Sequence, residues 1–142
     1  MKEIEKIIKQ EGDYHHFIHN CDGIEIDCEI IRNGLGALCG YVCINSDNSL
    51  YRLDYDEISF LIDYIPHGGL TWSEDNGSGS WQIGFDCIHA GDFCPNLPSN
   101  YGGGIYRDLE FVKSECKKLA ESVAKHSKLI KRLKNIDSIL GK

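Results

Sequence analysis

The chain of 142 residues is predicted to be a single α+β domain, 1–142. The expected architecture is an antiparallel sheet of four to five strands, packed by a long C-terminal amphipathic helix and a short N-terminal helix. Three observations predict it. Apolar and polar residues alternate in much of 14–90, apolar residues recur at helical spacing over 108–140, and a glycine- and proline-rich loop, 91–106, separates the two patterns.

Residues 1–12 place Ile4, Ile7 and Ile8 on one helical face just before Gly12, which predicts a short helix. In 24–30, Ile and Cys alternate with Glu and Asp, as in a half-buried strand whose outer face carries carboxylates. Turn residues in 32–36 separate this strand from a second apolar run at 37–44. The two runs predict an antiparallel hairpin.

The apolar segment 58–65 is rich in β-branched and aromatic residues, which favours a strand over a short helix. Residues 66–69 end this segment, and another strand is expected to begin within 70–72. Residues 74–80 have loop composition, and 81–87 alternates as a strand with Trp81 and Phe85 on its apolar face.

The C-terminal segment 108–140 combines an apolar stripe with many lysines, and Asp108 stands where an N-cap is expected. The pattern predicts one basic amphipathic helix, or a pair of helices bent near 126–127. Such a helix packs on a sheet or on a second subunit, or binds a membrane surface or nucleic acid. Packing is the favoured role because the apolar stripe must be covered.

The charge is unevenly distributed, with a balance of −13 over residues 1–111 and +6 over 112–142. The acidic body would repel phosphate groups, which argues against nucleic acid as a partner. The charged N-terminal residues and the short apolar runs indicate neither export nor a membrane span. We therefore expect a cytoplasmic protein whose seven cysteines are thiols, without the spacing of a zinc site.

Chemistry-bearing residues gather in two segments at predicted strand ends, 67–72 and 84–92. A metal-dependent hydrolase could use His67, Asp86, His89 and Asp92, since imidazole and carboxylate groups bind zinc, manganese or iron. A thiol nucleophile could be Cys87 or Cys94, activated by one of these histidines. The same polar residues could instead only tie loop backbone together through hydrogen bonds.

The remaining alternative is a pocket that binds a ligand without turnover, which these residues indicate as strongly as the purely structural role. Aromatic rings would stack on a base, glycine amides and an arginine would contact anionic groups, and carboxylates would accept hydrogen bonds from ribose hydroxyls. No catalytic residue and no cofactor is assigned. The predicted ligand-binding residues are His67, Gly68, Gly69, Thr71, Trp72, Trp81, Phe85, Asp86, His89, Asp92, Tyr106 and Arg107.

Several motifs in a fixed order carry a resemblance that spans residues 29–123. They are LCGYV at 38–42, the tyrosine- and aspartate-containing stretch 50–56, HGGLT at 67–71, GFDCIHAGD at 84–92, and YRD at 106–108 leading into the helix at 112–120. In these motifs the chain is similar to a family of small phage and prophage proteins, in which Tyr or Phe commonly stands at the position of Trp72. The resemblance implies a phage setting, and hence the cytoplasm of an infected bacterial host.

Short accessory phage proteins often blunt host immunity, and this context gives the functional hypothesis. We expect a homo-oligomeric host-defence antagonist that binds and sequesters a nucleotide-derived signal without turnover. Cyclic dinucleotides, cyclic trinucleotides and ADP-ribose cyclisation products are the candidate ligands. The alternatives are the metal-dependent hydrolase and an acidic decoy that binds a basic host defence protein.

Overall fold

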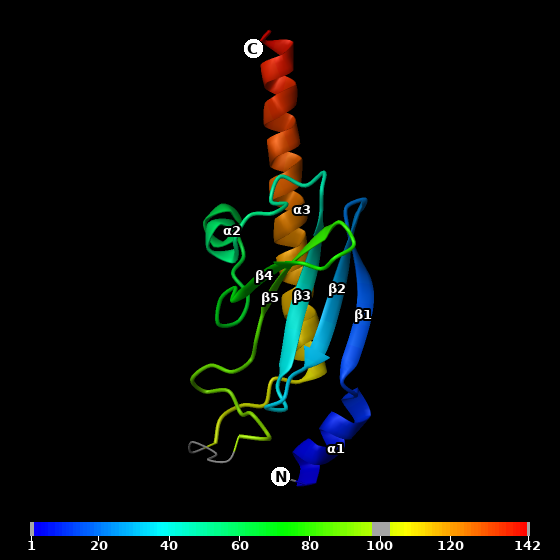
Figure 1. Ribbon diagram of the computed structural model, residues 1–142, viewed down its shortest axis with the longest axis vertical. Helices are drawn as coiled ribbons and strands as arrows, with labels where there is room; N and C mark the ends of the chain where they lie inside the picture. The colour runs from blue at the N-terminus through cyan, green and yellow to red at the C-terminus, as the bar shows by residue number, and fades with distance from the viewer. Residues whose placement is uncertain (1, 98–102, 142) are drawn as a thin grey trace.

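The computed structural model describes residues 2–97 and 103–141 of the chain and confirms the α+β class (Figure 1). Five antiparallel strands form one sheet in the order β1-β2-β3-β5-β4. The elements in chain order are α1 (Lys2–Glu11), β1 (Tyr14–Cys21), β2 (Ile24–Arg32), β3 (Leu38–Asn45), α2 (Tyr55–Leu61), β4 (Trp72–Asp75), β5 (Ser80–Phe85) and α3 (Leu109–Ile139).

The N-terminal half of α3 covers one face of the sheet, against β1, β2 and β3 (Figure 1). The alternation predicted for β2 is confirmed, because Ile26, Cys28 and Ile30 are buried beneath the helix. Burial of such side chains is the main favourable term in folding. From the helix side, the core receives Val112, Cys116, Leu119, Ala120 and Val123.

The helix begins where the sequence predicts, since the side chain of Asp108 accepts a hydrogen bond of 2.9 Å from the backbone N–H of Phe111. This capping bond satisfies a donor that the helix itself leaves open. The helix then continues without interruption to Ile139, so the predicted alternative of a bend near 126–127 is not what the chain adopts.

The expectation of a strand at 58–65 is wrong, because residues Tyr55–Leu61 form the helix α2. Asp54 caps this helix, and Asp56 and Glu57 lie in its first turn, where negative charge is favourable. Only Ile58 of this helix is buried, whereas Phe60 is 91% exposed. The capping and the one-sided burial outweigh the strand propensity of the segment. The strand β4 also extends to Asp75, into the residues predicted as a loop.

The glycine- and proline-rich loop is closed at its base by an isolated parallel bridge between Asp92 and Ile105. The backbone N–H of Phe93 donates to the carbonyl of Ile105, and that of Ile105 donates to the carbonyl of Gly91. Residues 98–102, which the sequence analysis included in this loop, lie outside the described residues. Within 2–97 and 103–141, no helix has both the length and the apolar composition needed to cross a membrane.

A buried ion pair attaches α1 to the rest of the fold. The side chains of Glu11 and Arg32 are 9% and 7% exposed and are joined by a 3.2 Å contact. Oε1 of Glu11 also accepts a 2.6 Å hydrogen bond from the hydroxyl of Tyr106, and Oε2 accepts one of 2.7 Å from the backbone N–H of Leu109. A single carboxylate thereby joins α1 to the first residue of α3, where the helix dipole favours negative charge.

Gly40 provides a test of the packing between sheet and helix. A Cβ atom at Gly40 would lie 2.5 Å from the ring of Phe85 and 2.7 Å from the sulfur of Cys116. The substitution Gly40→Ala is therefore expected to lower the free energy of unfolding by about 2–3 kcal/mol, measured by urea denaturation. Gly34→Ala is the matched control, because a Cβ there meets nothing within 4 Å. Equal stability of both variants would contradict this account of the packing.

Candidate functional site

The two segments singled out in the sequence, 67–72 and 84–92, lie against each other. Nε2 of His67 is 2.8 Å from Oδ2 of Asp92 and 3.0 Å from Oδ1. Further along, the hydroxyl of Thr71 donates to Oδ2 of Asp86 over 3.1 Å, and the backbone N–H of Thr71 donates to the carbonyl of Gly84. The two segments therefore meet in the fold.

Asp92 is the centre of this contact, and its carboxylate is fully buried. It accepts hydrogen bonds from His67, from Nε of Arg107 at 2.9 Å, and from the backbone N–H of His89 at 3.0 Å. Burial alone would raise the pKa of Asp92, but the hydrogen bonds from His67, Arg107 and His89 outweigh it and lower the pKa below its ordinary value. The folded protein therefore holds Asp92 as a carboxylate.

His67 is positioned by the helix α3 as well as by Asp92. Its backbone N–H donates to Oε1 of the buried Glu115 over 2.8 Å, and its ring packs edge-on against Phe111 with the ring centres 5.3 Å apart. The other oxygen of Glu115 accepts a 2.6 Å hydrogen bond from the hydroxyl of Tyr64. The helix thereby anchors the turn that carries the histidine.

Glycine is required at each of the two positions after His67, for a different reason at each. At Gly68, φ is +71° and the ring of His89 lies directly on the backbone, so that a Cβ atom would approach the imidazole to 2.1 Å. At Gly69, φ is +90° and the backbone N–H closes the turn by donating to the carbonyl of Pro66.

The ring of His89 also approaches a carboxylate of its own segment. Its Nε2 is buried and lies 2.9 Å from Oδ1 of Asp86, without the alignment of a hydrogen bond.

The aromatic residues of the predicted ligand site do not face a common pocket, although two of them lie within these segments. Phe85 is 1% exposed and belongs to the core, so it offers no face to a ligand. Trp81 packs partly against the core and donates from Nε1 to the carbonyl of Leu53, while Trp72 lies edge-on to Tyr41 at the end of the sheet. Tyr106 belongs to the Glu11 ion pair, where burial and Glu11 raise its pKa to about 12.

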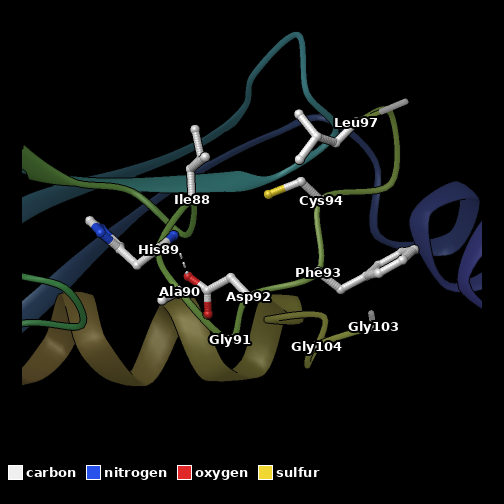
Figure 2. A pocket seen from close by; sticks show the side chains of 10 residues that line it. All are labelled: Ile88, His89, Ala90, Gly91, Asp92, Phe93, Cys94, Leu97, Gly103 and Gly104. Carbon is white, nitrogen blue, oxygen red and sulfur yellow. Dashed lines mark hydrogen bonds between the residues drawn. The ribbon is translucent and has the colours of Figure 1, made fainter. Parts of the chain in front are cut away.

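A cavity lies beside Asp92 and has a volume of about 600 Å³ (Figure 2). Of the predicted ligand-binding residues, only His89 and Asp92 line it. Figure 2 shows His89 directed away from the side chains of Cys94 and Leu97 on the other side of the cavity. Leu97 and Gly103, which flank residues 98–102, both belong to the lining. The other lining residues are Ile88, Ala90, Gly91, Phe93, Cys94 and Gly104.

The sequence reasoning missed most of this lining because it weighed polar and aromatic residues and passed over the apolar ones. The available signal was the length of the glycine- and proline-rich loop, which is typical of binding loops. Side chains such as Ile88 and Leu97 carry no signal of their own, since isolated apolar residues in a loop are common.

The metal and thiol hypotheses gain no support from this geometry. Among residues 2–97 and 103–141, no group of three or more His, Cys, Asp or Glu side chains is arranged to hold a metal ion. Instead, His67 is bonded to Asp92, and His89 lies against Asp86. The thiols of Cys87 and Cys94 are buried, and burial raises the pKa of both, which disfavours the nucleophilic thiolate.

Comparisons with protein-family models, with curated proteins and with solved structures find no match to this chain. The site is therefore interpreted from its own geometry. His67, Asp86, His89 and Asp92 hold the two segments together, and the loop supported in this way forms one wall of the cavity.

Asp92→Asn tests the buried carboxylate. We expect the free energy of unfolding to fall by about 3 kcal/mol, because the variant leaves Arg107 and His67 without their charged partner. Asp27→Asn is the matched control, since Asp27 also pairs with a histidine but is 53% exposed, and it should cost less than about 1 kcal/mol. Similar losses of stability in the two variants would contradict the role of the buried Asp92 carboxylate in holding the two segments together.

The pH dependence has a defined sign. A folded-state pKa below the ordinary value of 3.8 means that ionised Asp92 stabilises the fold above that pH, and that this contribution is lost as the pH falls below it. The stability difference between wild type and Asp92→Asn should therefore be constant near neutral pH and shrink below about pH 4. Urea denaturation of both proteins at a series of pH values measures this stability difference. A difference that grew on acidification would contradict the lowered pKa.

Proposed function

We propose that this protein is a binding protein that sequesters a nucleotide-derived small molecule, without turnover, in the cavity beside Asp92. In the phage setting that its motifs imply, this activity would antagonise a host defence that signals through such a molecule. The observation that carries the proposal is the cavity itself, because it lies against the conspicuous motif GFDCIHAGD at 84–92.

The size and lining of the cavity support this proposal. A volume of about 600 Å³ lies within the range of about 300–1,000 Å³ that is common for small-molecule sites. Apolar side chains such as Ile88 and Leu97 provide surface for a base or a sugar ring. The glycines at 91, 103 and 104 keep part of the lining free of side chains, so that backbone groups are near a bound molecule.

Arg107 supplies a cationic group next to this lining. Its Nε donates to Asp92, and its guanidinium lies over the ring of Phe111 at 4.9 Å, while the side chain stays 22% exposed. Among the hydrogen bonds of the described residues, none engages the terminal nitrogens of Arg107. These two NH2 groups are the kind of donors that recognise phosphate oxygens, and the bond from Nε to Asp92 helps to orient them.

Hydrogen bonds also hold in place the described lining residues near Asp92. The Asp92 carboxylate fixes the backbone of His89, and the bridge between Asp92 and Ile105 fixes the return of the chain. A wall held in place in this way lowers the entropic cost of binding.

Calorimetry tests the proposed function directly. The wild-type protein is expected to release or absorb heat with at least one of the cyclic dinucleotides, cyclic trinucleotides or ADP-ribose cyclisation products. The variant Ile88→Glu should bind at least about tenfold more weakly, because it places a carboxylate in the cavity against an anionic ligand. Ile7→Glu is the matched control, since Ile7 is 39% exposed, as is Ile88, but lies on α1.

Absence of heat with all of these compounds would count against a nucleotide-derived ligand. Equal binding by the Ile88→Glu and Ile7→Glu variants would instead place the ligand outside the cavity.

The uncovered face of the sheet favours a second candidate function, the acidic decoy. Outward positions on β2 carry Glu25, Asp27 and Glu29, and β4 adds Glu74. Among the strand residues that the structure describes, no outward position carries Lys or Arg. Exposed apolar side chains such as Ile18 lie among these carboxylates, a combination that suits a basic protein partner with apolar anchors.

For the decoy, capture of a basic protein from host lysate should weaken as salt is raised, because exposed charges are screened. The double variant Glu25→Lys with Asp27→Lys should lose the capture. The double variant Asp56→Lys with Glu57→Lys, on the first turn of α2, should keep it. Capture that is unchanged both by raised salt and by the double variant Glu25→Lys with Asp27→Lys would exclude this face as the binding surface.

A further inference from the structure

The C-terminal part of α3 extends beyond the sheet (Figure 1). The last buried residue of the helix is Ser127, and residues 131–141 are all exposed. Apolar side chains nevertheless continue along this projecting part. Leu129, Leu133, Ile136 and Leu140 are between 49% and 63% exposed. An apolar stripe of this kind lowers its free energy only when something covers it.

The spacing of this stripe is that of a coiled-coil seam. The four residues are separated by four, three and four positions, which is the alternation of d and a positions in a heptad. In this assignment, Leu133 and Leu140 occupy a positions, and Leu129 and Ile136 occupy d positions. Lys128, Lys131 and Lys134 then fall at c, f and b, on the side away from the seam.

Exposed apolar side chains also occur on the body of the protein near the start of the stripe. Leu129 and Leu61, at the end of α2, line the same shallow depression as the ion pair of Asp63 with Lys125. Phe60, adjacent to Leu61, is 91% exposed. Polar groups therefore separate these side chains from the helix stripe, which remains the apolar surface that needs a partner.

Charges beside the seam indicate which partner fits. Arg132 lies at a g position and Asp137 at the following e position, five residues later. In parallel coiled coils, a g residue of one helix meets the e residue of the next heptad in the other helix. Two copies of this helix side by side therefore place Arg132 of each copy opposite Asp137 of the other. An antiparallel pair would lose this match.

We propose that the projecting part of α3 associates with the same segment of a second copy of this chain, as a parallel coiled coil. Leu at both a positions with Ile136 at one of the two d positions is close to the pattern of seams that recruit more than two helices, so the assembly is expected to contain two or more chains. A membrane surface would instead favour lysines that flank the apolar stripe, whereas here they lie away from it.

Light scattering coupled to size-exclusion chromatography tests this proposal. The wild-type chain should have the mass of two or more copies at about 50 μM. Ile136→Asp should reduce the mass to that of one chain, because it puts a carboxylate into each side of the seam. Ser138→Asp, with the same new side chain on an f position of the same exposed helix, should leave the mass unchanged. Circular dichroism should show folded protein in every case.

Charge exchange then tests the orientation. Arg132→Asp alone should weaken the assembly by about threefold or more, because two carboxylates would face each other. Combining it with Asp137→Arg should restore the wild-type association, since the opposite charges meet again. A wild-type mass of one chain, an assembly that survives Ile136→Asp, or a double variant that stays as weak as the single one would each overturn the proposal.

Discussion

A buried carboxylate must be paired, and this requirement organises the loop end of the molecule. Asp92 is fully enclosed, so its charge is tolerated only because His67, Arg107 and the backbone of His89 donate to it. These groups come from three separate parts of the chain. Satisfying one charge therefore fixes the turn at 66–69, the loop after β5 and the approach to α3 relative to one another.

Two further carboxylates act in the same way. Glu11 joins α1 to the first turn of α3, and Glu115 joins α3 to the turn that carries His67. Each joins two segments through directional hydrogen bonds, whereas the strands and α3 are held together by hydrophobic burial. In the resulting molecule, buried carboxylates hold the loops in place at one end, and an uncovered helix projects from the other (Figure 1).

This division bears on the proposed function. The end held by these carboxylates has a cavity of a size that suits a small ligand, while the projecting helix presents an apolar surface that suits another protein chain. Binding and assembly would then use different parts of the fold. Of the four polar residues His67, Asp86, His89 and Asp92, only His89 and Asp92 line the cavity, and the other two support it from outside.

Local patterns determined most of the fold by themselves, because alternation in β2 and helical spacing in α3 each depend only on neighbouring residues. That the HGGLT and GFDCIHAGD segments lie near each other could be anticipated because both are at predicted strand ends. The hydrogen bonds that join them could not be anticipated. Only tertiary structure decided that Phe85 is core, that Tyr106 belongs to the Glu11 pair, and that 58–65 starts as a helix. Those outcomes depend on which distant side chains arrive at the same place, such as Cys116 and Gly40 against Phe85. No local spacing in the chain records such contacts.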